Sequence, residues 1–301
     1  MDRRSFLLAA AAAPFALRAD LPAALVTADT ESHVAVVDLL TGTVRARIPT
    51  RPGPRSVERV GAYAVVAHTA VGAVTVLYGN SVAHVLDELE EPRYTVGARD
   101  GLHAFVTDSG RRELATIDLL RGTVVARLKL WQWPRHLSVS RDGRTLWVGL
   151  GTASPELAVV DVSDPRRPRL SGKMRPPFPA HDVGFAPSGR RWVTAGETGE
   201  LAVYDRGTVQ ELPADAAPQH VTFLGGRAFV SSGAAGTLRV YDERTARLLH
   251  TVSVPGGSYN VQFSRGRILT PSLAAGTLCV LDGRGRLRDR IRVAASCHDA
   301  A

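Results

Sequence analysis

The chain of 301 residues contains only two cysteines, Cys279 and Cys297. Two cysteines are too few for a disulfide framework, and neither belongs to the Cys-x-x-Cys-His motif that attaches c-type haem. Cys279 lies in a run of apolar residues, so we expect it to be a small residue of the core. The sequence leaves open whether the two cysteines pair.

Long apolar runs and recognisable catalytic motifs are also missing. No apolar run of about 18 residues follows the N-terminal region, so we expect no membrane span in the mature chain. The sequence has no Gly-x-Ser-x-Gly elbow, no His-Glu-x-x-His zinc motif and no phosphate-binding P-loop. No particular class of enzyme is therefore indicated, and our leading hypothesis is a binding protein.

Lysine is scarce, although the formal net charge is +8. Lys129 and Lys173 are the only lysines, so arginine carries nearly all of the positive charge. The arginines are scattered through turns, as in Arg111-Arg112, and form no basic helix or stripe interleaved with aromatic residues. This distribution favours a solvated basic surface over a nucleic-acid-binding face, so we expect no nucleic-acid partner.

The first 19 residues read as a targeting segment. Arg3 and Arg4 are adjacent and are followed by Ser-Phe-Leu-Leu and a run of alanines. This pattern resembles a twin-arginine export signal, the alternative being an ordinary secretory signal. We expect cleavage after Ala19, a folded domain over residues 20–301, and a periplasmic or extracellular location. Without the leader, the net charge falls to about +6.

One phrase of the sequence recurs seven times, at intervals of about 37 to 44 residues. Its clearest part is a run such as Glu113-Leu-Ala-Thr-Ile-Asp118, and six of the seven copies end in Asp, which we expect to begin a turn. The copies span residues 33–38, 73–78, 113–118, 156–161, 200–205, 237–242 and 277–282. These runs are rich in Val, Leu, Tyr and Thr and are bounded by Gly, Asp and Asn, which is typical of β-strands. The repeat predicts an all-β, seven-bladed β-propeller with four antiparallel strands in each blade.

The two ends of the chain are expected to complete one blade together. The first copy lacks its first strand, because it begins near Ala24 with what looks like a second strand. The last residues, Ala295-Ser-Cys-His-Asp-Ala-Ala301, match the start of a copy such as Pro179-Ala-His-Asp-Val183. We therefore predict that the C-terminal strand joins the first blade and closes the ring.

The repeat resembles a known family of exported bacterial propellers. Phe105-Val106, Trp147-Val148, Trp192-Val193 and Phe229-Val230 are each followed by Gly and by a later strand that ends in Asp. This pattern is similar to the YVTN-repeat (YncE-like) family, without the Asn of the family phrase, over residues 23 to 301. The d1-haem and lactonase propellers are more distantly similar. The resemblance implies the fold but no one reaction, because these proteins use one scaffold for different chemistry.

Aligning the copies reveals one candidate site. The first strand of each blade should line the central channel, and its opening residue is polar in every copy. These opening positions are Ser56, Tyr94, His136, Asp182, His220, Asn260 and Asp299. His181 and His298 come immediately before two of them, so four of the nine histidines fall at or beside one ring. The candidate ligand-binding set is Tyr94, His136, His181, Asp182, His220, Asn260, His298 and Asp299.

Several kinds of ligand suit this ring. The leading hypothesis is a small molecule or an envelope protein bound at the channel mouth by a monomer. A first alternative is a transition metal or a haem-type cofactor held by His136, His181, His220 and His298, in an enzyme or a cofactor-handling protein. A second alternative is a lactone hydrolase that uses Asp182, Asn260 and Asp299. The polar residues can also serve only to satisfy exposed strand ends.

Two tryptophans complete the candidate site. Trp131 and Trp133 lie just before His136 in the sequence. An aromatic ring at a channel mouth can wall a pocket or stack on a planar ligand. Their position before His136 is compatible with either role.

Overall fold

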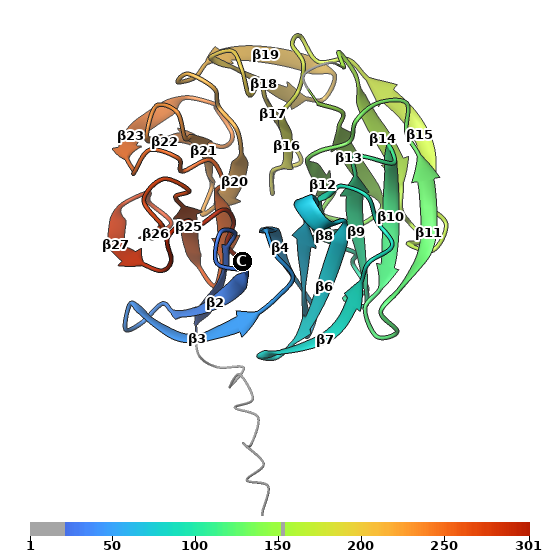
Figure 1. The fold of residues 1–301 in the computed structure, drawn as a ribbon. Helices are drawn as coiled ribbons and strands as arrows, with labels where there is room; N and C mark the ends of the chain where they lie inside the picture. Colours follow the sequence, from blue (N-terminus) through green and yellow to red (C-terminus); the bar gives the residue numbers. More distant parts are fainter. Residues whose placement is uncertain (1–21, 152–153) are drawn as a thin grey trace, which may run out of the picture.

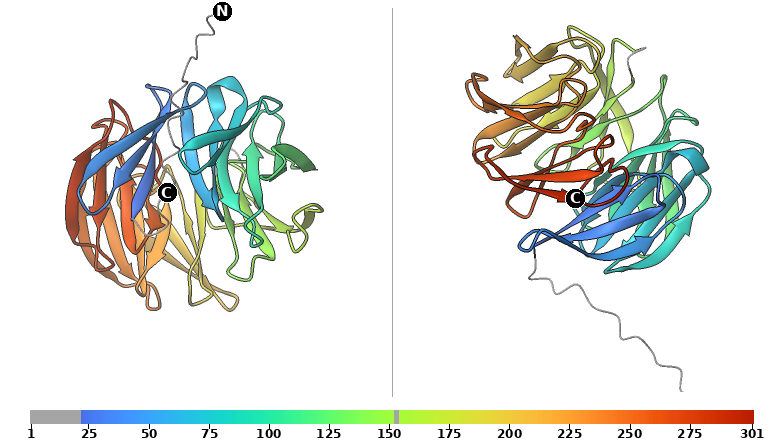
Figure 2. Two further views of the ribbon diagram at one scale, coloured as in Figure 1. Left: turned by 90° about the horizontal axis from the view of Figure 1, so that it is seen from below. Right: turned by 60° about the vertical axis from the view of Figure 1, so that its left-hand side comes forward.

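The computed structural model describes residues 22–151 and 154–301, so the expected leader over residues 1–19 lies outside the described part. Seven antiparallel sheets stand around a central axis, as Figure 1 shows. Two further views show the sheets side by side around that axis, with the first and last sheets next to each other (Figure 2). The structure thus confirms the predicted seven-bladed β-propeller.

Each blade has the same order of strands from the axis outward. The inner strands are β4 (Pro54–Val60), β8 (Pro92–Gly97), β12 (Leu137–Val139), β16 (Asp182–Phe185), β20 (Val221–Leu224) and β24 (Gln262–Ser264). The second strands are β1 (Ala23–Ala28), β5 (Tyr63–His68), β9 (His103–Asp108), β13 (Thr145–Gly149), β17 (Arg191–Thr194), β21 (Arg227–Ser232) and β25 (Arg267–Pro271). A short 3-10 helix, η1 (Thr69–Val71), follows β5.

The third strands coincide with the recurring runs of the sequence. They are β2 (His33–Asp38), β6 (Ala73–Tyr78), β10 (Glu113–Asp118), β14 (Leu157–Asp161), β18 (Glu200–Asp205), β22 (Thr237–Asp242) and β26 (Thr277–Leu281). The outer strands are β3 (Thr43–Pro49), β7 (Ser81–Leu86), β11 (Thr123–Lys129), β15 (Arg169–Met174), β19 (Thr208–Pro213), β23 (Leu248–Ser253) and β27 (Leu287–Arg292).

Burial explains why the third strands carry the clearest pattern. All six residues of β2 and of β10 are buried, because the blades on both sides cover the two faces of the sheet. In the outer strand β3, exposed residues instead alternate with half-buried ones, apart from the buried Ile48. Apolar side chains must therefore recur where blades meet, and polar ones can vary at the rim.

The aspartates that end the third strands begin turns, as predicted. The Asp38 carboxylate accepts hydrogen bonds from the backbone N–H groups of Leu40 and Thr41, at 2.7 and 3.2 Å. Asp118 and Asp242 each accept the same kind of bonds from the backbone N–H groups of the residues two and three positions later in the chain. These aspartates therefore fix the reversal of the chain between the third and outer strands.

The C-terminal segment supplies the inner edge of the first blade, as predicted. Strands β1, β2 and β3 form a three-stranded sheet, and Ala300 lies antiparallel to Val26 beside it. The N–H of Leu25 donates to the Ala301 carbonyl at 2.7 Å, and the Ala301 N–H donates back to Leu25 at 2.9 Å. Both ends of the described chain thus close the ring.

Side chains of the second strands tie neighbouring blades together near the axis. The Thr107 hydroxyl donates to the carbonyl of Arg135 in the next blade, and the Thr194 hydroxyl donates to that of Gln219, each at 2.7 Å. The Ser231 hydroxyl bonds in the same way to the Tyr259 carbonyl. These bonds set where each inner strand begins, and hence where the ring residues stand.

The core lies between the blades. Each cluster of buried apolar side chains joins two adjacent sheets; one of them contains Trp192 and Tyr241. Cys279 and Cys297 are both buried and free, in two different clusters. In the described part of the chain, no helix has the length and hydropathy to cross a membrane.

Candidate functional site

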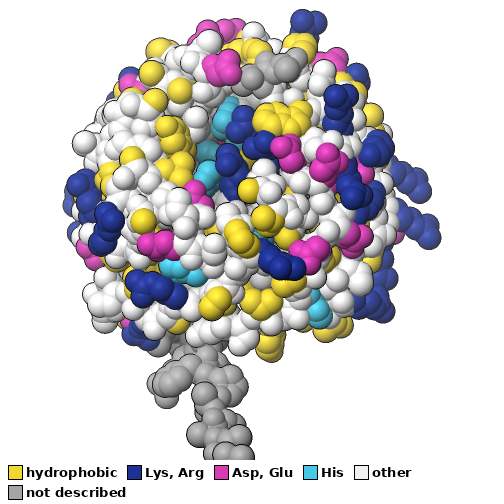
Figure 3. All heavy atoms as spheres, in the orientation of Figure 1, with side chains coloured by type: hydrophobic (Ala, Val, Ile, Leu, Met, Phe, Trp, Pro, Cys, Tyr) yellow, Lys and Arg dark blue, Asp and Glu magenta, His cyan; other side chains and the backbone are white. Residues whose placement is uncertain are grey.

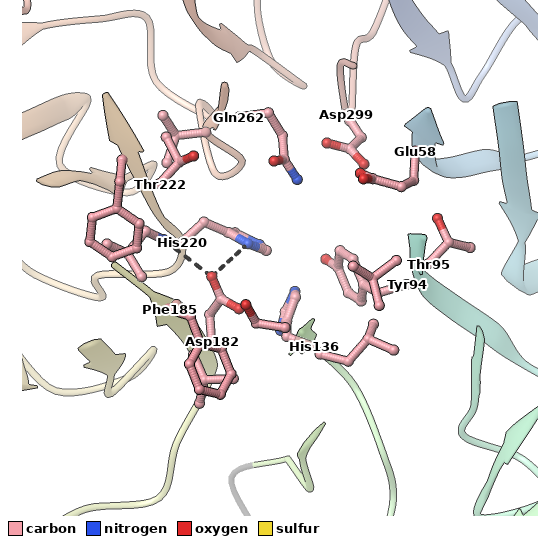
Figure 4. A pocket seen from close by; sticks show the side chains of 18 residues that line it. Glu58, Tyr94, Thr95, His136, Asp182, Phe185, His220, Thr222, Gln262 and Asp299 are labelled. Atoms are coloured by element: carbon pink, nitrogen blue, oxygen red, sulfur yellow. Dashed lines mark hydrogen bonds and ion pairs between the residues drawn. The ribbon is translucent and has the colours of Figure 1, made fainter. Parts of the chain in front are cut away.

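The propeller brings the predicted ring residues together around its axis. The side chains of Tyr94, His136, Asp182, His220 and Asp299 border one cavity, in which Figure 4 shows them converging from different blades. They are more buried than the sequence suggested for a solvent-filled channel mouth. Only 2% of His136 and 6% of His220 are exposed, so a ligand here would be largely removed from water.

Three histidines form the most compact part of the ring. His136, His181 and His220 each offer one ring nitrogen, and these nitrogens all lie within 4.8 Å of one another. The ring centres of His136 and His220 are 4.2 Å apart, and those of His136 and His181 are 4.4 Å apart. Tyr94 packs against the group, its ring centre lying 3.7 Å from that of His136.

A hydrogen bond orients one of these three rings, and a contact with a carboxylate orients a second one. The Nδ1 atom of His136 lies 2.8 Å from the carbonyl oxygen of His181. A carbonyl oxygen only accepts, so Nδ1 carries the proton, and Nε2, which is buried and has no hydrogen-bond partner, presents its lone pair. The Nδ1 atom of His220 lies 3.3 Å from the Asp182 carboxylate, which fixes the direction of that ring.

The surroundings keep two of these imidazoles neutral. Burial, and then the neighbouring His220 and His181 rings, hold the pKa of His136 well below its ordinary value. Burial, followed by His220, Arg135 and Arg55, lowers the pKa of His181 in the same way. Neutral imidazole is the form that ligates a metal ion.

The aspartates and the asparagine of the ring bond to the backbone of the neighbouring blade. Asp182 accepts from the Val221 N–H at 3.1 Å, and Asp299 accepts from the Val57 N–H at 3.0 Å. The Asn260 side-chain amide donates to the His298 carbonyl at 2.8 Å. The need of strand ends for polar partners therefore accounts for part of this ring. Asp182, Asn260 and Asp299 spend their polar atoms on separate partners, which does not favour the calcium-type cluster of the lactone-hydrolase alternative.

His298 lies apart from the three-histidine group. Its Nδ1 atom is 3.9 Å from the Asp29 carboxylate, and only 8% of the residue is exposed. Burial lowers its pKa to about 4. Three of the four histidines that the alignment singled out thus form the compact group, and the Asp182 carboxylate lies beside it.

The cavity extends from the ring along the inner strands and has a volume of about 210 Å³. Its wall includes Glu58, Phe185, Thr222 and Gln262, which follow ring positions in the sequence (Figure 4). Burial, then the Asp299 carboxylate, raises the pKa of Glu58 to about 8. Burial raises that of Asp299 to about 6. Near neutral pH the two facing carboxyl groups therefore carry about one proton between them.

The opposite side of the ring is basic, which the sequence analysis missed. Arg55, Arg93 and Arg135 immediately precede the ring positions Ser56, Tyr94 and His136. Lys or Arg and His side chains gather in the central hollow of the face in Figure 3. The sequence could have revealed them. They occupy the repeat position directly before the ring residue, which is also the position of His181 and His298 in their blades.

The two tryptophans before His136 do not border the cavity. The guanidinium carbons of Arg93 and Arg135 lie 4.1 and 5.2 Å from the centre of the Trp133 ring. Trp131 lies under the Lys173 ammonium group, at 4.0 Å. The expected aromatic wall is thus replaced by cation–π contacts that hold basic side chains in place.

The fold and the site together define a seven-bladed β-propeller with a buried three-histidine group on its axis. Similar solved structures are hydrazine synthase of Kuenenia stuttgartiensis and a functionally unknown protein of Desulfotomaculum acetoxidans DSM 771. The first has a TM-score of 0.74 and 18% identity, over 86% of this chain and 91% of that one. The second has a TM-score of 0.79 and 9% identity, over 93% and 98%.

A third similar structure is apo AztD from Citrobacter koseri, with a TM-score of 0.70 and 12% identity over 94% of this chain and 98% of that one. At these identities the likeness shows the fold alone. No protein-family model matches the chain, and no curated protein sequence matches it.

Proposed function

We propose that this chain is an exported binding propeller that holds one divalent transition-metal ion, of the zinc class, on its axis. His136, His181 and His220 would be the ligands. The observation that carries the proposal is the convergence of one ring nitrogen from each of three buried histidines. Beside it, the buried Nε2 atom of His136 has no hydrogen-bond partner among the described residues. A buried polar atom without a partner is costly unless a ligand supplies one.

The donor set fits such an ion. Neutral imidazole suits Zn, Cu, Fe and Ni, whereas Mg and Ca prefer oxygen ligands. In a tetrahedral zinc site with Zn–N bonds of about 2.0–2.1 Å, the ligand nitrogens are ~3.4 Å apart. The three nitrogens lie within 4.8 Å of one another, so small side-chain rotations would bring them into range.

The protein's own groups would orient and enclose the ligands. Asp182 would accept the Nδ1 proton of His220, and the His181 carbonyl would accept that of His136, which directs both Nε2 atoms to the ion. The Asp182 carboxylate also lies close enough to offset part of the positive charge. Tyr94 packs on His136 and shields the group from water.

Cavity size favours an ion over a haem-type cofactor. The space beside the histidines is about 210 Å³, below the roughly 300–1,000 Å³ typical of pockets for larger organic ligands. This space supports a second candidate ligand, a small organic molecule that contacts Glu58 and Asp299. Such a molecule would bind the wild type and a His136→Ala variant with comparable affinity.

We further propose that residues 1–19 are a twin-arginine leader and that the mature protein works outside the cytoplasm. The family-level part of the proposal is a distant relation to the YVTN-repeat propellers. It is supported by two features of the repeat: the pairs of an aromatic residue and valine in the second strands, and the aspartates that end the third strands. The mass of the protein recovered from the periplasm or medium tests the leader, with cleavage after Ala19 as the expected result.

Elemental analysis and cobalt titration test the metal proposal. Protein purified without a His tag should contain about one zinc-class ion per chain, and the metal-free form should bind Co²⁺ with the visible bands of a tetrahedral site. Outer-shell partners are worth about 10–100-fold in metal affinity. We therefore expect His136→Ala or His220→Ala to weaken binding about 100-fold or more, and Asp182→Asn about tenfold.

His250→Ala is the matched control, because His250 is exposed on the outer strand β23. This variant should bind metal like the wild type. Equal loss in the control, or wild-type protein that binds no Zn²⁺, Co²⁺, Ni²⁺ or Cu²⁺ at micromolar concentration, would overturn the proposal. A Soret-type absorption band would instead favour the haem-type alternative.

A further inference from the structure

Three arginines from consecutive blades lie beside the ring and are not among the residues that border the cavity. Arg55, Arg93 and Arg135 precede the inner-strand positions of the second, third and fourth blades. Each side chain is partly buried, and that of Arg93 is only 12% exposed. A surface arginine normally extends into water, so the fold holds these three against the axis at a cost.

The neighbouring groups position these arginines but do not neutralise them. Arg93 and Arg135 stack on Trp133, and the Trp133 N–H donates to the Glu91 carboxylate at 3.2 Å. Arg93 lies 3.6 Å from the same carboxylate. Within residues 22–151 and 154–301, neither Arg55 nor Arg135 forms an ion pair. Glu91 thus pairs with one of the three guanidinium groups, and the carboxylates of Asp299 and Glu197 act on Arg55 and Arg135 only from farther away.

The donors of these arginines are also incompletely used. The Nε atoms of Arg55, Arg93 and Arg135 are all buried and have no hydrogen-bond partner in the part of the chain that the structure describes. Burial, followed by Arg55 and Arg135, lowers the pKa of Arg93. Burial and then Arg55 lower the pKa of Arg135. Excess positive charge and unpaired N–H groups at one point are what a bound oxyanion would relieve.

We propose that the channel mouth binds a small oxyanion, through its carboxylate or phosphate groups, between Arg55, Arg93 and Arg135. The planar guanidinium forks match the oxygens of either group, and Trp133 holds two of them in position. The oxyanion site goes beyond the metal proposal and does not depend on it, because no metal ligand contributes to it.

Calorimetric titration of the metal-free protein with succinate and with inorganic phosphate tests the site. Succinate is a weak chelator, so traces of metal do not confuse the result, and the two probes distinguish a carboxylate ligand from a phosphate ligand. We expect saturable 1:1 binding of at least one probe at constant ionic strength. Each guanidinium group should contribute charged hydrogen bonds to the bound oxyanion. Arg55→Gln or Arg135→Gln should therefore weaken binding about tenfold or more.

Arg284→Gln is the matched control, since it removes the same charge from an exposed turn of the last blade. It should leave the affinity unchanged. Absence of saturable binding by both probes, or equal weakening in Arg284→Gln, would overturn the oxyanion proposal. If the arginine variants fail to fold, the melting temperature of the wild type decides. It must rise with succinate or phosphate and not with chloride at matched ionic strength.

Discussion

At the residue scale, His68 shows how a buried histidine can serve structure alone. It is fully buried on β5, with Nε2 2.9 Å from the Thr75 hydroxyl and Nδ1 3.3 Å from the Pro52 carbonyl. Burial lowers its pKa to about 4, although hydrogen bonds to the backbone of Pro52 and Arg51 favour the protonated ring. Unlike His136, it has both ring nitrogens paired, so nothing points to a ligand.

The low pKa of His68 predicts acid destabilisation. The unfolded chain binds a proton near pH 6.5 and the folded one only near pH 4, so the contribution of His68 is complete above pH 6.5 and falls as the pH drops toward 4. The loss amounts to about 3 kcal/mol at most. In His68→Gln, the free energy of unfolding should vary less with pH over this interval, as measured by denaturant titration.

The exposed His250→Gln variant is the control for this prediction and should keep the wild-type pH profile. His136, His181 and His298 also have lowered pKa values, so the dependence should shrink in His68→Gln without vanishing. An identical slope in wild type and His68→Gln would show that His68 titrates normally in the folded protein.

The sequence predicts which residues reach the axis better than it predicts what they contact. Alignment placed Tyr94, His136, Asp182, His220 and Asp299 at one cavity, because the repeat fixes where each inner strand begins. It did not separate His298 from the other histidines. That separation depends on Asp29, which approaches from a turn of the first blade. Contacts between side chains of distant blades leave no periodic trace in the sequence.

At the element scale, the clarity of each strand in the sequence follows its burial. The third strands were predicted within a residue or so at each end, since β14 begins at Leu157 and β26 ends at Leu281. The inner strands β12 and β24 have only three residues each. Such short strands, which border a channel, carry too little apolar pattern to be delimited from sequence alone.

A pair of glycines in turns separates backbone strain from crowding. Gly276 and Gly266 both adopt positive φ, at 60° and 75°. A Cβ on Gly276 would collide with the carbonyl oxygens of Ala294 and Ala295, whereas one on Gly266 would meet no atom within 4 Å. Gly266→Ala should therefore cost only the left-handed penalty of roughly 1 kcal/mol.

Gly276→Ala should cost clearly more, about 2 kcal/mol or above, because the segment that leads to the closing strand must move. Denaturant unfolding of the two variants measures both costs. Comparable values would mean that the turn at Ala294 and Ala295 yields easily, and that its contact with Gly276 does not help to position the C-terminal segment.

At the scale of the whole molecule, closure of the ring depends on very few residues. Four backbone hydrogen bonds join Leu25 and Thr27 to His298, Asp299 and Ala301. Asp299 also bonds to the Val57 N–H of the second blade. The C-terminal segment therefore completes the first blade and connects it to the second blade. Its Asp299 side chain also lines the cavity.

Removing residues 298–301 should lower the melting temperature by on the order of 10 °C, because several backbone bonds and the inner edge of one sheet are lost. Differential scanning calorimetry measures the change. Asp299→Asn is the matched variant, since it keeps the strand and alters only the carboxylate, and it should retain most of the stability. A truncated protein that melts like the wild type would contradict the closure argument.

The same closure gives the propeller a mechanical direction of weakness. Residue 22 enters the first blade beside the point where Ala301 ends, so tension applied through these two residues acts across the bonds between β1 and the C-terminal segment. Hydrogen bonds of antiparallel strands lie perpendicular to the strands, so this pull separates them one after another. The ring would therefore open first between β1 and the C-terminal segment, by successive loss of these hydrogen bonds, before tension reaches the other six blades.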